Sequence, residues 1–346
     1  WVLNFTTAGI ADGSEVIKAV PASSSSIYDG ANNPAAVVQS NNTASLNEKV
    51  LPIIAGTAIN AANTELTVTF NEDVFSTTGG GPANLVTGDF TLSITGGVAT
   101  IASFDSVAKT SDTEWVLAFT TAGIANGSER IAVVPASSSS IYDGADNAAA
   151  ATQSNNNVLL NEKVVPTLSS VSISSNNATP TLAVHNNVVT LTFTASETLS
   201  AAVVTFSSGG TPINSGRVTP SNSGNAWTFS YSALNTDPDG QITFSVAFTD
   251  AAGNLGTPET NVDDSSSVLF DKSPPTLGPV TIASDNSTST NWAKTGDEVT
   301  LSYTSNETLQ TPPTVVFLSG GQPVVNRLGH TPAITYANTG NSYTAQ

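Results

Sequence analysis

The sequence contains no cysteine and no methionine, and only 10% of its 346 residues are charged. Because cysteine is absent, no disulfide can staple a domain, and each domain must be held by its own hydrophobic core or by a bound metal ion. A zinc site would also lack its usual ligands, since the two histidines, His185 and His330, lie in unrelated contexts. The same scarcity leaves no motif for a Ser-His-Asp set, so we expect no enzyme.

Basic residues are scarce as well. The chain has 9 lysines and arginines against 27 aspartates and glutamates, which gives a formal net charge of −18. Nucleic acids and anionic lipids are bound through Lys and Arg, so we expect no nucleic-acid partner and no membrane insertion in this segment. Cations are more suitable ligands for such an acidic chain. Ser, Thr, Asn, Gly and Ala take the place of the usual charged surface, as is common in secreted repeat arrays.

Helical periodicity is nearly absent from the sequence. The recurring pattern is instead an alternation of apolar and polar residues, which indicates strands with one buried and one solvated face. Clusters of Gly, Asn, Asp and Pro separate these strands at the short spacing of a β-sandwich. The buried faces are predicted to hold Leu66, Val68 and Phe70 in TELTVTF, Trp115, Leu117 and Phe119 in EWVLAF, Trp227, Phe229 and Tyr231 in AWTFSYS, and Ile242, Phe244, Val246 and Phe248 in QITFSVAF.

The sequence also repeats itself at about the length of one small sandwich domain. The ten residues PASSSSIYDG occur at residues 21–30 and again at 135–144, within a repeat that relates residues 1–50 to 115–164. About three quarters of the positions in that repeat agree. A weaker repeat relates the segments that begin at Pro166 and Pro275. We therefore expect consecutive sandwich units, the outer two incomplete, as in a window from a longer protein.

Two resemblances refine this prediction. The stretches FNEDVFS, GDFTLSITGG and FTTAGIANGSE resemble the SWM-type repeat of very large bacterial surface proteins. The stretches VTLTFTASETL and FSVAFTDAAGN resemble the bacterial Ig-like domains that stack in giant adhesins and motility-associated surface proteins. The resemblances imply an all-β chain of tandem Ig-like β-sandwich domains arranged as an extended rod. Its predicted parts are the C-terminal part of a SWM-like repeat at 1–50, a complete SWM-like repeat at 51–164, an Ig-like domain at 165–273 and the N-terminal part of a further one at 274–346.

Acidic residues recur at equivalent places in these units. An acidic corner follows the second strand of each unit, and an Asp/Asn loop such as YDGADN or TDAAGN comes late in the unit. In an Ig-like sandwich both places lie at the end where the preceding domain attaches, so their oxygens are expected to converge near the linker. Ca²⁺ accepts six to eight oxygen ligands with flexible geometry and suits such a junction. The candidate ligands are Glu72, Asp73, Asp143, Asp146, Asn147, Glu162, Glu197, Asp250, Asn254, Asp263, Asp271 and Glu307.

A structural interpretation of the same residues stays open. Asp and Asn favour turns because their side chains bond local backbone N–H groups and tolerate left-handed conformations, which is enough to explain YDGADN and DAAGN. The stretch TDPDG at residues 236–240 begins like a calcium loop, but the later acidic ligands are missing, and a hairpin turn is the better interpretation. Recent duplication likewise explains the identical PASSSSIYDG loops without a ligand.

The expected function is mechanical. The resemblances imply a stalk or filament segment of a giant extracellular bacterial surface protein, located at the cell surface, that projects an adhesive or motility-related tip. Its partners would be the neighbouring repeats of the same chain. The alternative is that the repeats are themselves adhesive and bind surface glycans or other cell-surface proteins along the filament, which repetition would turn into avidity.

Exposed aromatic residues would favour that alternative. Trp1, Trp115 and Trp227 alternate in phase with buried faces, and Trp292 aligns with Leu182 of the preceding unit, so all four tryptophans are predicted to be core residues. In the duplicated loop, Tyr28 and Tyr142 either cap the end of a sandwich or form a repeated weak contact surface.

Overall fold

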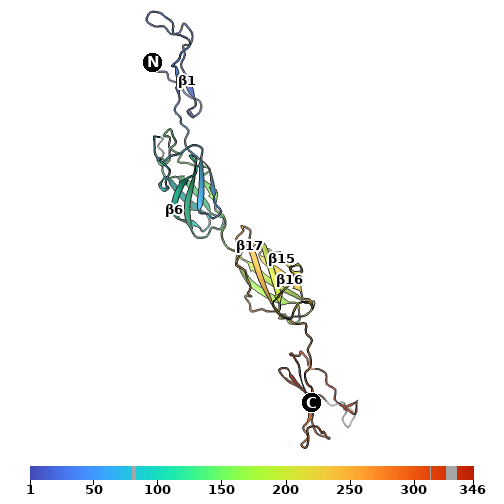
Figure 1. Ribbon diagram of the computed structural model, residues 1–346. Helices are drawn as coiled ribbons and strands as arrows, with labels where there is room; N and C mark the ends of the chain where they lie inside the picture. Colours follow the sequence, from blue (N-terminus) through green and yellow to red (C-terminus); the bar gives the residue numbers. More distant parts are fainter. Residues whose placement is uncertain (80–82, 312, 325–332) are drawn as a thin grey trace. The chain divides into compact units, whose positions relative to one another are not determined.

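The computed structural model describes residues 1–79, 83–311, 313–324 and 333–346. Strands and loops make up nearly all of this chain, as Figure 1 shows. The helices found in the described residues are the single 3-10 turns η1 (Thr87–Asp89) and η2 (Ser215–Arg217). The sequence-based prediction of an all-β fold is therefore confirmed. His330 lies outside the described residues.

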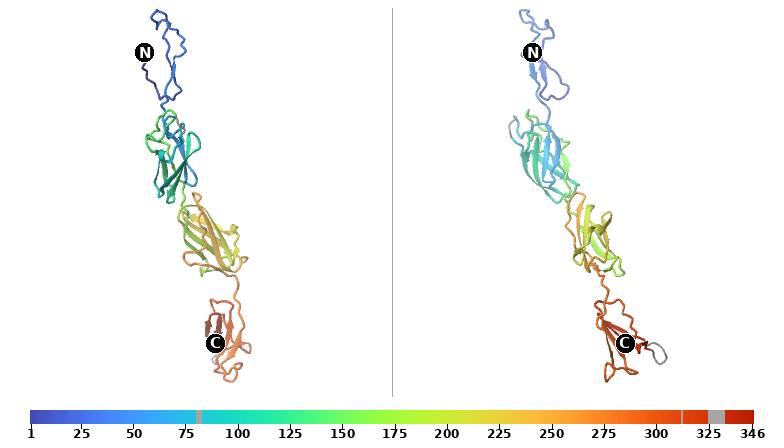
Figure 2. Two further views of the ribbon diagram at one scale, coloured as in Figure 1. Left: turned by 60° about the vertical axis from the view of Figure 1, so that its left-hand side comes forward. Right: turned by 45° about the vertical axis from the view of Figure 1, so that its right-hand side comes forward.

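Residues 54–159 form two antiparallel sheets, which can be followed from two further sides in Figure 2. The first sheet has the order β3-β4-β7-β6 and the second the order β5-β8-β9. Their side chains meet in one hydrophobic core, in which the rings of Phe70 and Phe90 lie 6.5 Å apart from opposite sheets. The strands are β3 (Ile54–Ile59), β4 (Glu65–Phe70), β5 (Phe90–Thr95), β6 (Thr100–Lys109), β7 (Glu114–Ala122), β8 (Arg130–Pro135) and β9 (Asn157–Leu159).

Residues 168–270 also form two sheets. One has the order β10-β12-β16-β15 and the other the order β11-β18-β17-β13-β14, with β11 and β18 parallel. Phe206 of β13 and Tyr231 of β16 pack across the two layers with ring centroids 4.9 Å apart. The strands are β10 (Leu168–Ser175), β11 (Leu182–Ala183), β12 (Val188–Ala195), β13 (Leu199–Ser208), β14 (Thr211–Pro212), β15 (Thr219–Ser223), β16 (Ala226–Ser232), β17 (Gly240–Asp250) and β18 (Leu269–Phe270).

In the described residues the two outer stretches contain fewer strands than the two sandwiches. Residues 1–50 contain the two-stranded pair β1 (Val16–Lys18) and β2 (Thr43–Ser45). The last stretch has a four-stranded sheet of order β19-β20-β24-β23 and a hairpin of two strands. Its strands are β19 (Thr281–Ser284), β20 (Val299–Thr304), β21 (Leu318–Ser319), β22 (Gln322–Pro323), β23 (Tyr336–Thr339) and β24 (Ser342–Ala345).

The predicted buried faces agree with the observed ones in β4, β7, β16 and β17. Leu66, Val68, Trp115 and Leu117 are fully buried, and the four alternate residues of β17 are buried as well. Trp227 of β16 is half-buried and stacks on Phe193. The alternation predicts these faces because successive side chains of a strand point to opposite sides.

The prediction was wrong for two tryptophans. Trp292 is 64% exposed, and Leu182, with which it aligns, is itself 37% exposed on the edge strand β11. An alignment to an edge strand therefore says little about burial. Trp1 is fully exposed, whereas its counterpart Trp115 is buried in β7, which pairs with β4 and β6.

The contacts within the chain define two compact units. The first comprises residues 1–168, 195–203 and 247–258, and the second comprises residues 169–194, 204–246 and 259–346. Both carboxylate clusters described below lie in the first unit.

Candidate metal centre

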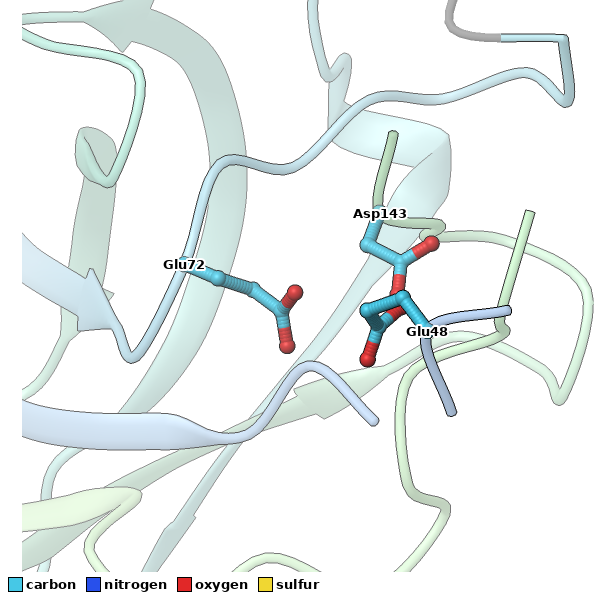
Figure 3. Close-up of side chains that lie close together, drawn as sticks. All are labelled: Glu48, Glu72 and Asp143. Carbon is cyan, nitrogen blue, oxygen red and sulfur yellow. The ribbon is translucent and has the colours of Figure 1, made fainter. Parts of the chain in front are cut away.

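Three carboxylates from separate parts of the sequence come together beside the sheets of residues 54–159. Glu48 lies in the segment that precedes β3, Glu72 follows the end of β4, and Asp143 belongs to the YDGADN loop after β8 (Figure 3). One carboxylate oxygen of each lies within 4.8 Å of the others. Glu48 and Glu72 are half-buried, and Asp143 is only 2% exposed. This group is called the Glu48 cluster below.

Local hydrogen bonds position Asp143. Its Oδ1 accepts bonds from the backbone N–H groups of Ala145 and Asn147, both at 2.8 Å. Asp146 supports this turn with a φ of 69°, a left-handed conformation that Asp and Asn tolerate better than most residues. The loop is tied to the sandwich where the N–H of Phe75 donates to the carbonyl of Tyr142 at 2.8 Å.

Glu48 is held by both the linker and the loop. The backbone N–H of Val50 donates to its Oε1. The side-chain amide of Asn147 donates to its Oε2 and, at 2.8 Å, to Oδ2 of Asp143. One amide group therefore bridges two carboxylates, one from the linker and one from the sandwich.

The same arrangement recurs with Glu162, Glu197 and Asp250, which we call the Glu162 cluster. Asp250 ends β17 and is 1% exposed, and Glu197 lies between β12 and β13. Asn254 takes the place of Asn147, since its Nδ2 donates to Oε2 of Glu162 at 2.5 Å and to Oδ2 of Asp250 at 2.8 Å. The backbone N–H of Val164 donates to Glu162 as that of Val50 does to Glu48.

These carboxylates repel one another. Burial raises the pKa of Glu48 and of Glu72 above the usual range, and the nearby charge of Asp143 raises both further. Burial, with Glu162 and Asp250, does the same to the pKa of Glu197. Burial alone would raise the pKa of Asp250, but hydrogen bonds from Asn254 lower it. Among the described residues no lysine or arginine forms a salt bridge with either cluster, and the donors to their carboxylates are amide N–H groups.

The remaining candidate ligands lie elsewhere. Asp73 is exposed beside Glu72, and the carboxylate of Asp146 accepts a bond from the N–H of Gly79 instead of facing the cluster. Asp263 accepts from the N–H of Val171 at 2.8 Å, and Asp271 accepts from Ser273 at 2.9 Å. Oε1 of Glu307 is buried with no hydrogen-bond partner among the described residues. Asn147 and Asn254 contact the clusters as hydrogen-bond donors, through their side-chain amide groups.

The sequence-based list missed Glu48. The motif LNEK occurs at residues 46–49 and again at 160–163. The repeat thus places Glu48 at the position equivalent to Glu162 and is the signal that identifies it as a candidate ligand. Asp271 occupies the corresponding place in LFDK and shares one local feature, because each of the three acidic side chains accepts a bond from the backbone N–H two residues later.

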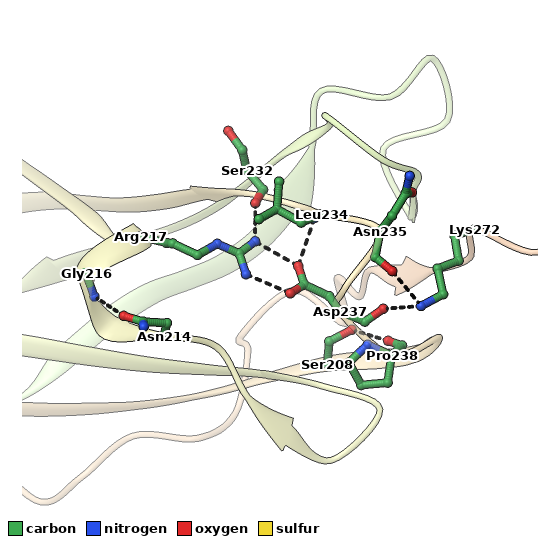
Figure 4. Close-up of polar contacts among 10 residues, drawn as sticks. All are labelled: Ser208, Asn214, Gly216, Arg217, Ser232, Leu234, Asn235, Asp237, Pro238 and Lys272. Carbon is green, nitrogen blue, oxygen red and sulfur yellow. Dashed lines mark hydrogen bonds and ion pairs between the residues drawn. The ribbon is translucent and has the colours of Figure 1, made fainter.

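The stretch TDPDG forms a turn, but the prediction of a hairpin was wrong, because the turn joins β16 of one sheet to β17 of the other. Asp237 is buried and pairs with Arg217 at 2.7 Å, while its backbone carbonyl accepts from Nζ of Lys272 at 2.7 Å (Figure 4). Asp239 accepts bonds from the N–H of Lys272 and the hydroxyl of Ser273. Donors within the chain thus already engage both aspartates.

The first copy of this loop, which reads YDGANN at residues 28–33, shows how much of the geometry is local. Asp29 accepts from the backbone N–H groups of Ala31 and Asn33 at 2.8 and 2.9 Å, and Asn32 has a φ of 63°. The loop conformation is therefore the same without the rest of a sandwich around it. What the second copy adds is the approach of Glu48 and Glu72 from other parts of the chain.

The duplicated tyrosines do not form a repeated exposed surface. Tyr28 is 52% exposed, whereas Tyr142 is half-buried and its backbone bridges to both Phe75 and Ala148. In the complete sandwich the loop therefore closes the end of the fold.

Together the paired sheets and repeated junction clusters define a tandem array of Ig-like β-sandwiches. No family model matches the chain, and no curated protein matches it. Among solved structures, titin domains I67-I69 in an E-to-A mutated variant share 8% identity over 85% of this chain and 82% of that chain, with a TM-score of 0.35. The I9-I11 tandem of titin shares 9% identity over 86% of this chain and 87% of that chain, with a TM-score of 0.23. Among the described residues no helix is long and apolar enough to cross a membrane.

Proposed function

We propose that this chain is a spacer segment of an extracellular bacterial surface protein, and that Ca²⁺ binds the Glu48 and Glu162 clusters and fixes each linker to the sandwich that follows it. The observation that carries the proposal is the recurrence of one cluster design on two different sandwiches. In both, an asparagine amide bridges a linker glutamate and a buried loop aspartate, and a corner glutamate lies beside them.

The ligand chemistry favours calcium among the common divalent cations. All the carboxylate oxygens are hard ligands, and neither cluster contains histidine or cysteine, which zinc sites usually use. Mg²⁺ demands a near-ideal octahedron, whereas Ca²⁺ accepts six to eight oxygens in irregular geometry. Carboxylates that bind in bidentate fashion, together with water, would complete that number, and rotation of Asn147 or Asn254 would present a carbonyl oxygen in place of the amide N–H.

A cation at these places would act on the linker. Glu48 and Glu162 lie in the segments that join consecutive parts of the chain, while the other two ligands of each cluster belong to a sandwich. Without a cation, the like charges of the three carboxylates repel the linker glutamate from the sandwich. A bound cation would attract all three carboxylates and hold the linker glutamate against the sandwich. Calcium would therefore set the stiffness of the array.

The surface role draws support from composition. The chain is acidic, poor in lysine and free of cysteine, so it suits a calcium-rich exterior and needs no oxidation to fold. A net charge of −18 disfavours association of parallel chains through charge repulsion. The resemblance to SWM-type repeats and bacterial Ig-like domains leads to the same proposal.

Thermal unfolding with millimolar Ca²⁺ and then with chelator tests the calcium part. A ligand present at about 100 times its dissociation constant stabilises the folded state by about 2.7 kcal/mol, so the midpoint should fall clearly when chelator is added. Small-angle scattering on the same samples should show a smaller maximum dimension without calcium.

Glu72→Gln and Glu197→Gln make the test specific. Each removes one ligand, and each should abolish the calcium response of its own sandwich. In chelator the same variants should be as stable as the unchanged chain or more so, because one of three repelling charges is gone. Asp29→Asn is the matched control, since Asp29 occupies the same loop outside any cluster. A thermal unfolding midpoint that does not respond to calcium would mean that the acidic residues only stabilise turns, and it would contradict the proposal.

A further inference from the structure

The turn that follows β7 contains the one asparagine of this chain that precedes a glycine, Asn126. Residues 125–129 form this turn, which we call the Asn126 turn. The side chain of Asn126 is exposed, and Gly127 has a φ of +82°. An asparagine side chain reacts most readily with the next backbone nitrogen when glycine follows, because glycine has no Cβ to obstruct the approach.

Hydrogen bonds in the turn favour this reaction. Oδ1 of Asn126 accepts a bond from the backbone N–H of Ser128 at 3.0 Å, and the N–H of Asn126 donates to Oε2 of Glu129 at 2.9 Å. The first bond folds the side chain over the peptide bond to Gly127, which is the nitrogen that Cγ must meet. Among the described residues no group accepts a hydrogen bond from the N–H of Gly127, so none opposes the loss of its proton.

The same bond stabilises the charge that the reaction creates. When the nitrogen of Gly127 attacks Cγ of Asn126, negative charge develops on Oδ1. A hydrogen-bond donor that already points at such an oxygen lowers the barrier, because it needs no rearrangement during the reaction. The N–H of Ser128 is that donor. The Asn126 turn thus combines an unobstructed nucleophile with a carbonyl group whose oxygen is already hydrogen-bonded.

The first copy of the repeat carries the expected product in the same turn. Asp12 occupies the position that corresponds to Asn126. Its Oδ1 accepts a bond from the N–H of Ser14 at 2.9 Å, and its own N–H donates to Oε2 of Glu15 at 3.1 Å. These two bonds are equivalent to those of the Asn126 turn. Aspartate therefore fits this turn without a change in its hydrogen bonds.

We propose that Asn126 is a site of spontaneous deamidation in the folded chain. The nitrogen of Gly127 gives its proton to hydroxide and forms a bond to Cγ of Asn126, and the side-chain nitrogen leaves as ammonia. The resulting succinimide takes up one water molecule. Breakage of the new Cγ–N bond gives aspartate, whereas breakage of the original backbone C–N bond gives isoaspartate. One water is consumed, one ammonia is released, and no oxidant is needed.

The two products differ in their effect on the linker. The N–H of Lys163 donates to the carbonyl of Ala125 at 2.8 Å, and a Cβ on Gly127 would lie 3.2 Å from Cβ of Glu162. Isoaspartate adds one carbon to the main chain between these two contacts, so the turn can no longer make both. We therefore expect isoaspartate, but not aspartate, to loosen the linker. An effect on calcium binding rests on the proposed function, whereas the deamidation does not.

Mass spectrometry of the full chain tests the reaction. The folded chain is incubated at neutral and at mildly alkaline pH and sampled over time. Proteolysis after Lys109 and Arg130 releases residues 110–130, in which Asn126 is the single asparagine. This peptide should gain the mass difference between an amide and a carboxylic acid, at a rate that rises with pH. Tandem mass spectrometry should find both aspartate and isoaspartate at the modified position.

Asn214 is the internal control. Its Oδ1 accepts a bond from the N–H of Gly216 at 2.8 Å, in the same kind of turn, but Ser215 follows it. Asn214 should remain unmodified in samples in which most of Asn126 has reacted. A synthetic peptide of residues 110–130 gives the rate without the fold, and Asn126 should react in the folded chain at least as fast. An Asn126 that stays intact in the folded chain while the peptide reacts, or an Asn214 that reacts equally fast, would overturn the proposal.

Asn126→Asp is the matched control for the effect on the linker. This variant has the same added charge as the deamidated chain but an unchanged main chain. In chelator its unfolding midpoint should equal that of the fresh chain, whereas the purified isoaspartate form should unfold at a lower temperature. Equal midpoints for the variant and the isoaspartate form would contradict the effect on the linker. A chain that deamidates at Asn126 but does not respond to calcium would support this inference and contradict only the proposed function.

Discussion

The carboxylate of Glu129, in the second copy of the repeat, is fully buried and joins two loops through hydrogen bonds to their backbone N–H groups. Its Oε1 accepts from the backbone N–H groups of Val98 and Ala99, at 2.8 and 3.1 Å, and its Oε2 accepts from that of Asn126 at 2.9 Å. Gly97, at a φ of +58°, leaves no space for a side chain, since a Cβ there would lie 2.1 Å from Oε1 of Glu129. Burial works against the charge, but these bonds outweigh it and hold the pKa of Glu129 below its usual range.

We expect Glu129→Gln to lower the free energy of unfolding by about 1 to 3 kcal/mol, because one buried N–H group would face an amide that cannot accept its bond. The lowered pKa adds a pH dependence. The ionised form stabilises the fold above the ordinary glutamate pKa of 4.5, and this contribution is lost as the pH falls below that value. Denaturant unfolding at neutral and acid pH measures both effects. Glu15→Gln, at the counterpart position in the first copy, should change the free energy of unfolding little. An equal loss of stability in both variants would refute the role of the Glu129 hydrogen bonds.

The ion pair between Arg217 and Asp237 is the second residue-scale test. The hydrogen bond from Arg217 lowers the pKa of Asp237 more than any other contact, and the side chain of Asp237 is nearly buried. Its stabilising effect is therefore present above the ordinary aspartate pKa of 3.8 and disappears as the pH falls below it.

Asp237→Asn should lower the free energy of unfolding by about 1 to 3 kcal/mol near pH 7, and the difference from the unchanged chain should shrink in acid. Urea titrations from about pH 6 to about pH 2 follow this convergence. Asp112→Asn is the control, since Asp112 pairs with Lys109 on the surface, where an ion pair contributes about 0 to 1 kcal/mol. A difference that stays constant with pH would rule out the ion pair as its cause.

At the scale of elements, the repeat supplies identical strand sequences in two environments. Trp115 opens the buried face of β7 with no exposed surface, whereas the same residue in the first copy, Trp1, is fully exposed. Strand preference is equal in the two copies, so any difference in the effect of substitution reports tertiary packing alone.

Trp115→Ala should lower the free energy of unfolding of its sandwich by about 3 to 5 kcal/mol, because the substitution leaves a large cavity in the core. Trp1→Ala should leave the unfolding midpoint where it is. Comparison of the two thermal unfolding curves is sufficient. Similar losses in both would mean that residues 1–50 are already packed in a sandwich in solution.

At the scale of the whole molecule, the two clusters predict the number of calcium ions. The described residues contain two groups of three carboxylates, while the next junction offers Asp271 and Glu307 without a buried loop aspartate among them. Calorimetric titration should therefore give two sites per chain of similar affinity. Glu48→Gln should remove one site and leave the other unchanged. A single site, or a loss of both in this variant, would contradict independent clusters.

The sequence by itself determined the all-β fold, the buried faces of β4, β7 and β17, and the conformation of the YDGADN turn. All of these depend on alternation or on hydrogen bonds between residues close in sequence, and the exposed first copy of the turn shows that no tertiary contact is needed.

Only the tertiary structure decided which acidic residues meet. Glu48, Glu72 and Asp143 are distant in sequence, and nothing local separates them from Asp146 or Asp263, whose oxygens face backbone N–H groups elsewhere. It also decided that residues 115–164 are buried, because β7 joins the sheet of β3, β4 and β6 while β8 and β9 join β5. A repeated sequence therefore specifies local conformation, whereas burial depends on the strands that the rest of the chain packs against it.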